Sequence, residues 1–225
     1  MSAKELLGKP SADARREELG RRSAAFRTRT GSPPRLAVVL ATTDEAARAY
    51  FRSKERLGEK LRVQVDEVRV ASPTTEGLID AVRSLALDSS AHGIMVETPV
   101  PDGVDLCAVQ DAIPPAKDVD GASTLSLGRV FSGQPGFAPA TAAAVMALLD
   151  GHGIELRGVP AVVVGRSLVV GRPLGQLLLA RGATVTTCHS QTKDLAALTR
   201  SGDVVCVAVG KSRFLGAGAV RPGAV

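Results

Sequence analysis

Residues 162–173 decide the fold that this sequence predicts, and they run Val-Val-Val-Gly-Arg-Ser-Leu-Val-Val-Gly-Arg-Pro. The three valines are typical of a strand buried on both faces, which we expect over 160–164. Gly165 permits a tight turn, and Gly171 begins a helix with Pro173 in its first turn. A strand that turns through glycines into a helix N-terminus can bind a phosphate with backbone N–H groups. The segment predicts a dinucleotide site, although its spacing is not the common Gly-x-Gly-x-x-Gly.

The end of the next strand indicates which dinucleotide binds. We expect this strand over 183–187, with His189 and Ser190 just after it. A site for NAD would place Asp or Glu here to bind the ribose 2′-hydroxyl, and no carboxylate is present. Arg166 can instead pair with a 2′-phosphate, with Ser167 and Ser190 as supporting donors. The sequence therefore favours NADP over NAD. The alternative is that Arg166 and His189 are ordinary surface-loop residues.

Strand and helix patterns alternate through both halves of the chain. In the first half we expect strands at 36–41, 62–70 and 93–96 and helices at 44–58 and 74–85. In the second half we expect helices at 171–181 and 194–200 and a strand at 203–209. Such alternation indicates parallel strands joined by crossover helices. The predicted fold is α/β and two-lobed, with an N-terminal α/β domain over 1–139 and a C-terminal Rossmann-like doubly wound parallel sheet over 140–225.

Local signals set the limits of these elements. Thr42 and Glu45 have the spacing of a capping box, so we expect Thr42 to cap the helix that follows. Gly58 is expected to end that helix. Residues 97–138 contain frequent Pro and Gly and predict a loop, and an Ala-rich helix over 141–149 follows as a connector between the lobes.

Composition excludes several classes of protein. The 225 residues carry a net charge of +5, but only 3% are aromatic and none is Trp, which argues against a base-stacking nucleic-acid platform. No apolar run approaches the roughly 18 residues of a membrane helix, and the N-terminus lacks a signal peptide's apolar region. The three cysteines lie far apart, which argues against a metal site and fits a reducing compartment. We expect a cytoplasmic protein with no metal, nucleic-acid or membrane partner.

Arginines crowd the first thirty residues. Six of them are interleaved with Glu17 and Glu18 at helical spacing. A solvated helix face is the simpler interpretation, and an anion-binding patch is the alternative.

Four side chains are candidates for chemistry. Tyr50, the chain's only tyrosine, and Lys54 are four residues apart and share one helix face. Glu97 directly follows a predicted buried strand, at the edge where ligands bind α/β sheets. Asp120 precedes Gly121, and its carboxylate could accept two N–H donors from a planar heterocycle. Each has a structural alternative, since a Tyr-x-x-x-Lys pair is common and Asp often only forms a turn.

Together these segments resemble the methylenetetrahydrofolate dehydrogenase/methenyltetrahydrofolate cyclohydrolase family. The motifs that carry the resemblance are Tyr50-x-x-x-Lys54, Lys117-Asp-Val-Asp-Gly121, Gly165-Arg-Ser-x-x-Val-Gly-Arg-Pro173, Thr184-Val-Thr-Thr-Cys-His-Ser190 and Ala208-Val-Gly-Lys211. The resemblance extends from about Pro34 to the last residue. It implies a folate cleft between two lobes, NADP on the second lobe, tetrahydrofolate derivatives as substrates, and a homodimer.

The resemblance also implies roles. Tyr50 would stack on the pterin, Lys54 would transfer protons, and Asp120 would bind the amidine edge of the pterin. The methylene carbon between N5 and N10 would give a hydride to the nicotinamide, which requires positioning but no base. Water would then add to the methenyl cation, and a proton acceptor is needed for that step.

This sequence departs from the family pattern at three places. Glu97 stands where the family has Gln, and a carboxylate beside Lys54 favours the ammonium form and makes it a poorer base. The sequence therefore leaves cyclohydrolase activity open. Ala47 lacks the hydroxyl of the family's Asn/Asp-Pro-Ala-Ser turn. Pro139-Ala-Thr-Ala142 replaces Pro-x-Thr-Pro, which mainly affects entry into the connector helix.

The last residues, Pro222-Gly223-Ala224-Val225, resemble the entry to a strand, so we expect more chain to follow. Three hypotheses stay open. The first is an NADP-dependent methylenetetrahydrofolate dehydrogenase, with or without cyclohydrolase activity. The second is a diverged, low-activity paralogue that binds NADP or folate in a regulatory role. The third is another NADP oxidoreductase, similar to shikimate dehydrogenase, which the motif at 117–121 disfavours.

Overall fold

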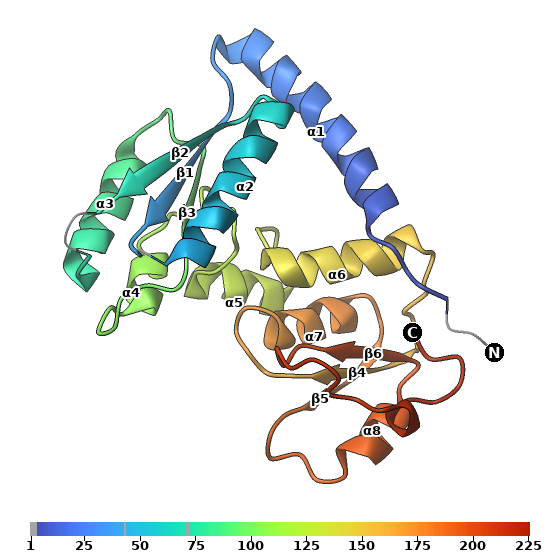
Figure 1. Cartoon of the computed structure of the whole chain (residues 1–225). Coiled ribbons are helices and arrows are strands. Elements are labelled where there is room, and N and C mark those ends of the chain that lie inside the picture. The colour runs from blue at the N-terminus through green and yellow to red at the C-terminus, as the bar shows by residue number, and fades with distance from the viewer. Residues whose placement is uncertain (1–3, 43, 71–72) are drawn as a thin grey trace. The chain divides into compact units, whose positions relative to one another are not determined.

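The computed structural model describes residues 4–42, 44–70 and 73–225, and the chain divides into two units. The N-terminal unit is Lys9–Ser126, and the C-terminal unit is Leu127–Val225 with the described residues before Lys9. Each unit contains a three-stranded parallel sheet with helices packed on it (Figure 1). The predicted α/β class with parallel sheets is confirmed. The domain boundary between 139 and 140 stays a prediction.

The N-terminal unit has the strand order β2-β1-β3. Its elements are α1 (Lys9–Thr30), β1 (Arg35–Leu40), α2 (Glu45–Leu61), β2 (Gln64–Arg69), α3 (Thr75–Leu87), β3 (Gly93–Val96), α4 (Leu106–Asp111) and the start of α5 (Thr124–Ser132). β1 pairs with β2 from Arg35↔Gln64 to Leu40↔Arg69 and with β3 from Leu36↔Gly93 to Val39↔Val96. Because both pairings are parallel, the carboxyl ends of all three strands lie at one edge of the sheet.

Alternating side chains of β1 divide the core of this unit. Ala37, Val39 and Ala41 pack with buried residues of α3 and α4. Val38 and Leu40 are also buried and point to the opposite face of the sheet, because successive strand residues alternate. Right-handed crossovers place α2 and α3 on opposite faces, as Figure 1 shows.

The C-terminal unit has the strand order β5-β4-β6. Its elements are α6 (Ala140–Gly151), β4 (Pro160–Val164), α7 (Gly171–Ala180), β5 (Thr184–Cys188), α8 (Leu195–Ser201), β6 (Val204–Val207) and a short 3₁₀ turn, Ala217–Ala219. Ala161 and Val163 pack with α6 and α7, whereas Val162 and Val164 pack with residues of α8. At the last described residue, the Val225 N–H donates to the Asp203 carbonyl oxygen (2.8 Å), a contact typical of strand pairing.

Two limits predicted for α2 are wrong. The cap is Asp44, whose carboxylate accepts from the Ala47 N–H at 2.8 Å, while the Thr42 hydroxyl accepts only from the Asp44 N–H. The helix also continues past Gly58 to Leu61. A Cβ on Gly58 would lie 2.5 Å from a Val65 methyl carbon, so this glycine serves close packing of α2 on β2.

The stretch predicted as a loop over 97–138 contains two helices. In α4, the Asp105 carboxylate accepts from the Ala108 N–H (3.0 Å) and starts a helix of only six residues. In α5, the Ser123 hydroxyl accepts from the Ser126 N–H (3.2 Å). Proline and glycine around both helices hid them, although the capping side chains were visible in the sequence.

Helix α1 is the solvated helix predicted for the arginine-rich start of the chain. Ser23 is its only residue classed as buried, and three ion pairs join residues four apart: Lys9–Asp13, Arg21–Glu17 and Arg22–Glu18. Such exposed pairs add little stability each. Phe26 fixes the end of the helix through an edge contact with His92, at 5.0 Å between ring centroids.

The three cysteines are free thiols with different environments. Cys107 is exposed, Cys188 is buried, and burial raises the pKa of the Cys206 thiol to about 11. Since the thiolate is the reactive form, we expect only Cys107 to react rapidly with a disulfide reagent at pH 8 in the native protein. A colorimetric thiol assay should detect one fast thiol before denaturation and three after it. Two or more fast thiols in the folded protein would contradict the described burial.

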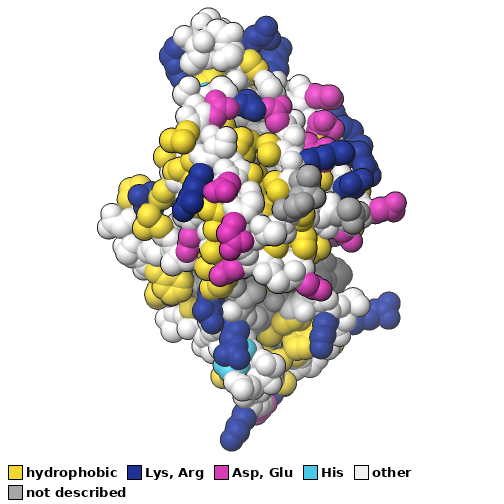
Figure 2. All heavy atoms as spheres, turned by 90° about the vertical axis from the view of Figure 1, so that its left-hand side faces the viewer, with side chains coloured by type: hydrophobic (Ala, Val, Ile, Leu, Met, Phe, Trp, Pro, Cys, Tyr) yellow, Lys and Arg dark blue, Asp and Glu magenta, His cyan; other side chains and the backbone are white. Residues whose placement is uncertain are grey.

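No helix among the described residues is long and apolar enough to cross a membrane. On the face shown in Figure 2, Lys and Arg side chains lie among Asp, Glu and apolar side chains.

Candidate active site and dinucleotide loop

A buried ion pair is the centre of the N-terminal unit's site. The Lys54 Nζ donates to the Glu97 Oε2 at 2.5 Å. The Lys54 side chain is 17% exposed and that of Glu97 is 7% exposed, so both charges are largely removed from water. Lys54 comes from α2 and Glu97 from the residue after β3, whose N–H continues the sheet by donating to the Val39 carbonyl oxygen. The fold therefore joins two predicted residues that are 43 positions apart.

Tyr50 belongs to the same cluster. The Lys54 Nζ lies 3.6 Å from the centroid of the Tyr50 ring, a cation–π contact between residues one helical turn apart. Tyr50 is nevertheless 61% exposed. A large, exposed aromatic ring beside a buried charge pair offers a surface on which a planar heterocycle can stack. The Thr98–Pro99 peptide bond that follows Glu97 is cis.

Asp120 interacts electrostatically with Lys54 and Glu97 and so belongs to the same cluster. Burial raises the pKa of its carboxyl, the neighbouring Asp118 and Glu97 carboxylates raise it further, and Lys54 partly opposes them. The carboxyl groups of Asp118, Asp120 and Glu97 therefore interact with one another and with the Lys54 ammonium in a single cluster. An acid whose charged form is disfavoured gains from a ligand that donates N–H groups to it.

We expect the Asp120→Asn variant to be more stable than the parent protein at pH 7, by about 1 kcal/mol. The folded-state pKa of Asp120 lies above its ordinary value of 3.8, so its ionised form costs stability at neutral pH. This cost falls as the pH drops through the raised pKa and is absent below 3.8. Urea unfolding at pH 7 and at about pH 4 would measure the difference. Asp80→Asn, at an exposed position on α3, is the control; an equal gain there, or no gain for Asp120→Asn, would contradict the argument.

Asp118 is a structural residue that the sequence did not distinguish from Asp120. It is fully buried, and its carboxylate accepts from the backbone N–H groups of Ala122 and Ser123 and the hydroxyls of Ser123 and Ser126. The neighbouring Lys117 Nζ donates to three carbonyl oxygens at the end of α3, of residues 85, 86 and 88. These two residues hold the turn that presents Asp120.

The predicted phosphate loop of the C-terminal unit is tightly built around two glycines. A Cβ on Gly171 would lie 2.2 Å from the Gly165 carbonyl oxygen, and one on Gly165 would lie 2.4 Å from the Ala208 carbonyl oxygen. Gly165 also has φ 128°, which L side chains rarely adopt. The loops after β4 and β6 therefore approach closely, and Pro173 is buried behind them in the first turn of α7. Only glycine fits either position.

Ser167 has a structural role in the loop, and its predicted contact with the cofactor stays a prediction. Its hydroxyl accepts from the N–H groups of Val170 (3.2 Å) and Gly171 (3.4 Å), so it holds the turn that leads into α7. The Gly171 and Arg172 N–H groups at the start of α7 donate within the loop, to the Ser167 hydroxyl and carbonyl oxygen, and phosphate binding by this loop stays a prediction. The hydroxyl proton of Ser167 remains available as a donor.

The residues expected at the adenosine end lie on adjacent loops. The Gly165 N–H donates to the Cys188 carbonyl oxygen at 2.8 Å, which joins the loop carrying Arg166 to the one carrying His189 and Ser190. Arg166 and Ser190 are exposed. The His189 Nδ1 accepts from the Gln191 N–H at 3.2 Å, so this ring nitrogen stabilises the local turn and only Nε2 is left for a ligand. Among the described residues no group of His, Cys, Asp or Glu could hold a metal ion.

The fold and the two sites define a dinucleotide-dependent α/β enzyme with a separate catalytic unit. Family models specify it further. The model for the tetrahydrofolate dehydrogenase/cyclohydrolase catalytic domain matches residues 6–120, and the model for the NAD(P)-binding domain of the same family matches residues 139–225. The chain belongs to the tetrahydrofolate dehydrogenase/cyclohydrolase family, which confirms the resemblance and removes the shikimate dehydrogenase-like alternative.

Individual relatives agree with this family assignment. A bifunctional protein FolD from Parafrankia sp. is 51% identical, over 87% of this chain and 71% of the relative's length. A bifunctional protein FolD 2 from Frankia alni is 45% identical, over 100% of this chain and 78% of the relative's length. A silkworm 5,10-methylenetetrahydrofolate dehydrogenase matches with a TM-score of 0.92 and 33% identity, over 99% of this chain and 81% of that one. A Trypanosoma brucei FolD structure, described as complexed with NADP cofactor and inhibitor, matches with a TM-score of 0.87 and 31% identity. The match covers 94% of this chain and 73% of that one.

Proposed function

We propose that this protein oxidises 5,10-methylenetetrahydrofolate to 5,10-methenyltetrahydrofolate with NADP and then hydrolyses the product to 10-formyltetrahydrofolate. The observation that carries the proposal is the buried Lys54–Glu97 pair, placed beside Tyr50 and Asp120 in the unit that matches the catalytic-domain model. The family models that match both units are named for a dehydrogenase/cyclohydrolase, which supports both activities.

Each residue of the cluster has a task in this reaction. The exposed Tyr50 ring stacks on the pterin, and the Asp120 carboxylate accepts N–H groups from its amidine edge. These contacts hold the methylene carbon in place, and positioning supplies most of the rate of a hydride transfer. Lys54, held by Glu97, delivers or accepts protons when water adds to the methenyl carbon and a carbon–nitrogen bond opens.

The residues of the C-terminal unit fit NADP. Neither Gly165 nor Gly171 has room for a side chain, so no side chain at these positions shields the loop from a diphosphate, and the Ser167 hydroxyl can donate to it. Arg166 suits a 2′-phosphate, since no acidic residue stands at the end of β5. When bound, NADP supplies the hydride acceptor.

An absorbance assay tests the function. Purified protein, methylenetetrahydrofolate and NADP should give NADPH, together with a transient methenyl signal that decays as the formyl product forms. NADPH without decay of the methenyl signal would restrict the protein to the dehydrogenase step. Absence of NADPH with NADP still bound, measured by calorimetry, would favour a low-activity paralogue with a binding role.

The same proposal includes a homodimer in a reducing, cytoplasmic compartment. The three free, dispersed thiols support the compartment. Sedimentation velocity at micromolar concentration should give the mass of two chains, and a single-chain mass would overturn the dimer.

A further inference from the structure

The start of α7 has backbone donors that the loop before it already uses. The N–H groups of Val170 and Gly171 donate to the Ser167 hydroxyl at 3.2 and 3.4 Å. The Arg172 N–H donates to the Ser167 carbonyl oxygen at 3.0 Å. Pro173, the next residue, has no N–H to donate. A diphosphate at this helix N-terminus would therefore share its N–H donors with Ser167, and a nearby cation would add charge-assisted hydrogen bonds that these groups do not supply.

The Arg172 side chain is placed to supply that cation. Arg172 is the second residue of α7, and it is exposed. Because each Cα–Cβ bond of a helix tilts toward the helix N-terminus, this side chain extends back toward the loop that begins at Gly165. The bond from its own N–H to Ser167 fixes the backbone that carries it. Arg166, the other arginine of the loop, directly follows Gly165 and is assigned to the 2′-phosphate.

No carboxylate of the neighbouring sequence competes for Arg172. The chain has no Asp or Glu between Glu155 and Asp194, so β4, α7, β5 and the loops that join them carry none. Within the described part of the chain, the Arg172 guanidinium has no hydrogen-bond or ion-pair partner. Arg181, just after the other end of α7, instead pairs with Asp150 at 2.7 Å. The donors of Arg172 are therefore available to an anion at the loop.

We infer that Arg172 binds the diphosphate of NADP, so that the two arginines of the loop bind different phosphates. Arg166 pairs with the 2′-phosphate, which NADP has and NAD lacks. Arg172 pairs with the diphosphate, which both dinucleotides contain, and therefore contributes to affinity without contributing to the preference for NADP. The inference rests on the proposed NADP site but not on the folate reaction.

Calorimetric titration of the full chain with NADP and with adenosine 2′-monophosphate tests this assignment, because only NADP contains the diphosphate. We expect Arg172→Gln to bind NADP about tenfold more weakly than the parent and to bind the monophosphate as the parent does. Its ratio of NADP affinity to NAD affinity should equal that of the parent, whereas loss of Arg166 should lower this ratio. Arg172→Lys should recover part of the affinity, because the ammonium keeps the charge. Unchanged NADP binding in Arg172→Gln, or an equal loss for the monophosphate, would overturn the inference.

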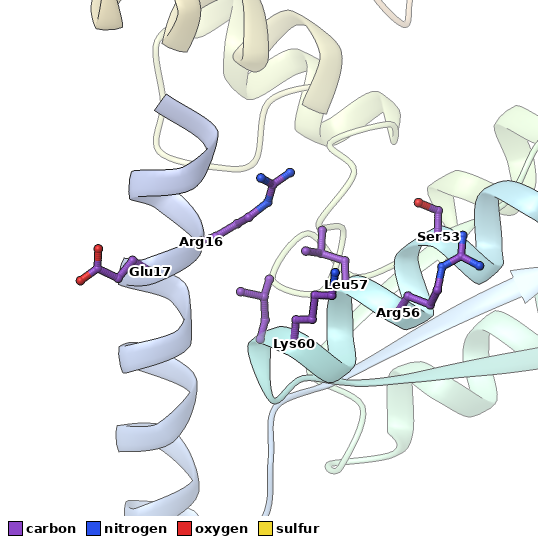
Figure 3. Close-up of a pocket in the computed structure, with 7 residues that line it drawn as sticks. Arg16, Glu17, Ser53, Arg56, Leu57 and Lys60 are labelled. Carbon is purple, nitrogen blue, oxygen red and sulfur yellow. The ribbon is translucent and has the colours of Figure 1, made fainter. Parts of the chain in front are cut away.

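The matched control is Arg56→Gln. Arg56 is also an exposed arginine on a helix, and within the described residues it has no hydrogen-bond or ion-pair partner. It belongs to the N-terminal unit, where it lines a pocket between α1 and α2 (Figure 3). Its loss changes the net charge as much as the loss of Arg172 does and should leave NADP binding unchanged. A loss of NADP affinity as large in this control would indicate a general charge effect and overturn the assignment.

Lys211 is the rival candidate for the diphosphate. It follows β6, and the loop after β6 approaches Gly165 closely at Ala208. Weaker NADP binding in Lys211→Gln, with none in Arg172→Gln, would assign the diphosphate to that loop and overturn the inference. A parent protein that binds no NADP would overturn the inference and the NADP site together. A parent that binds NADP without forming NADPH would contradict the proposed reaction alone, and the titrations would still decide the role of Arg172.

Discussion

The Arg166→Gln variant is expected to bind NADP about 10- to 100-fold more weakly than the parent protein while its affinity for NAD changes little. A guanidinium paired with a dianionic 2′-phosphate forms charge-assisted hydrogen bonds that a neutral amide cannot replace. Arg166 is exposed at the carboxyl end of β4, and Gly165 ties its loop to the end of β5. Calorimetry with both dinucleotides would measure the ratio of the two affinities.

The matched control for this experiment is Arg157→Gln. Arg157 is also exposed and lies before β4, at the opposite end of the strand, so its removal changes the net charge equally without touching the loop. A loss of NADP affinity as large in this control would indicate a general electrostatic effect. An Arg166→Gln variant that still prefers NADP would show that another group recognises the phosphate. His189 would then be the next candidate, through the ring nitrogen that its own turn does not use.

Buried strands and glycine turns were predictable because both depend on local sequence. The valines of β4 have no polar neighbours, and Gly165 and Gly171 must adopt conformations or contacts that other residues cannot. The Lys54–Glu97 contact was also predictable, but only through the family resemblance. The spacing of the two residues along the chain contains no sign of it.

Other features depend on contacts that local patterns do not encode. Gly58 was expected to end α2, yet it lies inside the helix because Val65 of β2 packs against it. The Ser167 hydroxyl accepts from two backbone N–H groups in the turn before α7, a structural contact that local sequence did not indicate. Asp118 and Asp120 stand two residues apart in one motif, and only the fold shows that Asp118 is consumed by four internal donors while Asp120 stays available.

The Glu97→Gln variant is expected to hydrolyse methenyltetrahydrofolate about tenfold faster than the parent, or more. In the parent, the carboxylate 2.5 Å from the Lys54 Nζ stabilises the ammonium in a setting with little water. A glutamine keeps the size of the side chain and can still accept one hydrogen bond, but it removes the negative charge. Lys54 then loses its charge-assisted hydrogen bond and is freer to contact the water that adds to the methenyl carbon.

The dehydrogenase step separates this effect from a general change in the site. Hydride transfer from the methylene carbon needs no base, so NADPH formation should change much less than methenyl decay does. Glu67→Gln is the matched control, because Glu67 also forms an ion pair in the N-terminal unit, with Arg69 on β2, and its loss should leave both rates unchanged. Stopped-flow absorbance would record the two steps in one experiment.

The increase must also depend on Lys54. Adding Lys54→Met to Glu97→Gln should abolish the gain in hydrolysis, because no amine then remains to take the proton. A gain that survives this second change would mean that water is activated elsewhere. An unchanged or slower hydrolysis in Glu97→Gln alone would show that the carboxylate helps the reaction, for instance by orienting Lys54 over the Tyr50 ring. In a cluster where burial already disfavours ionised Asp120, we therefore expect the charge at position 97 to decide how the two activities are balanced.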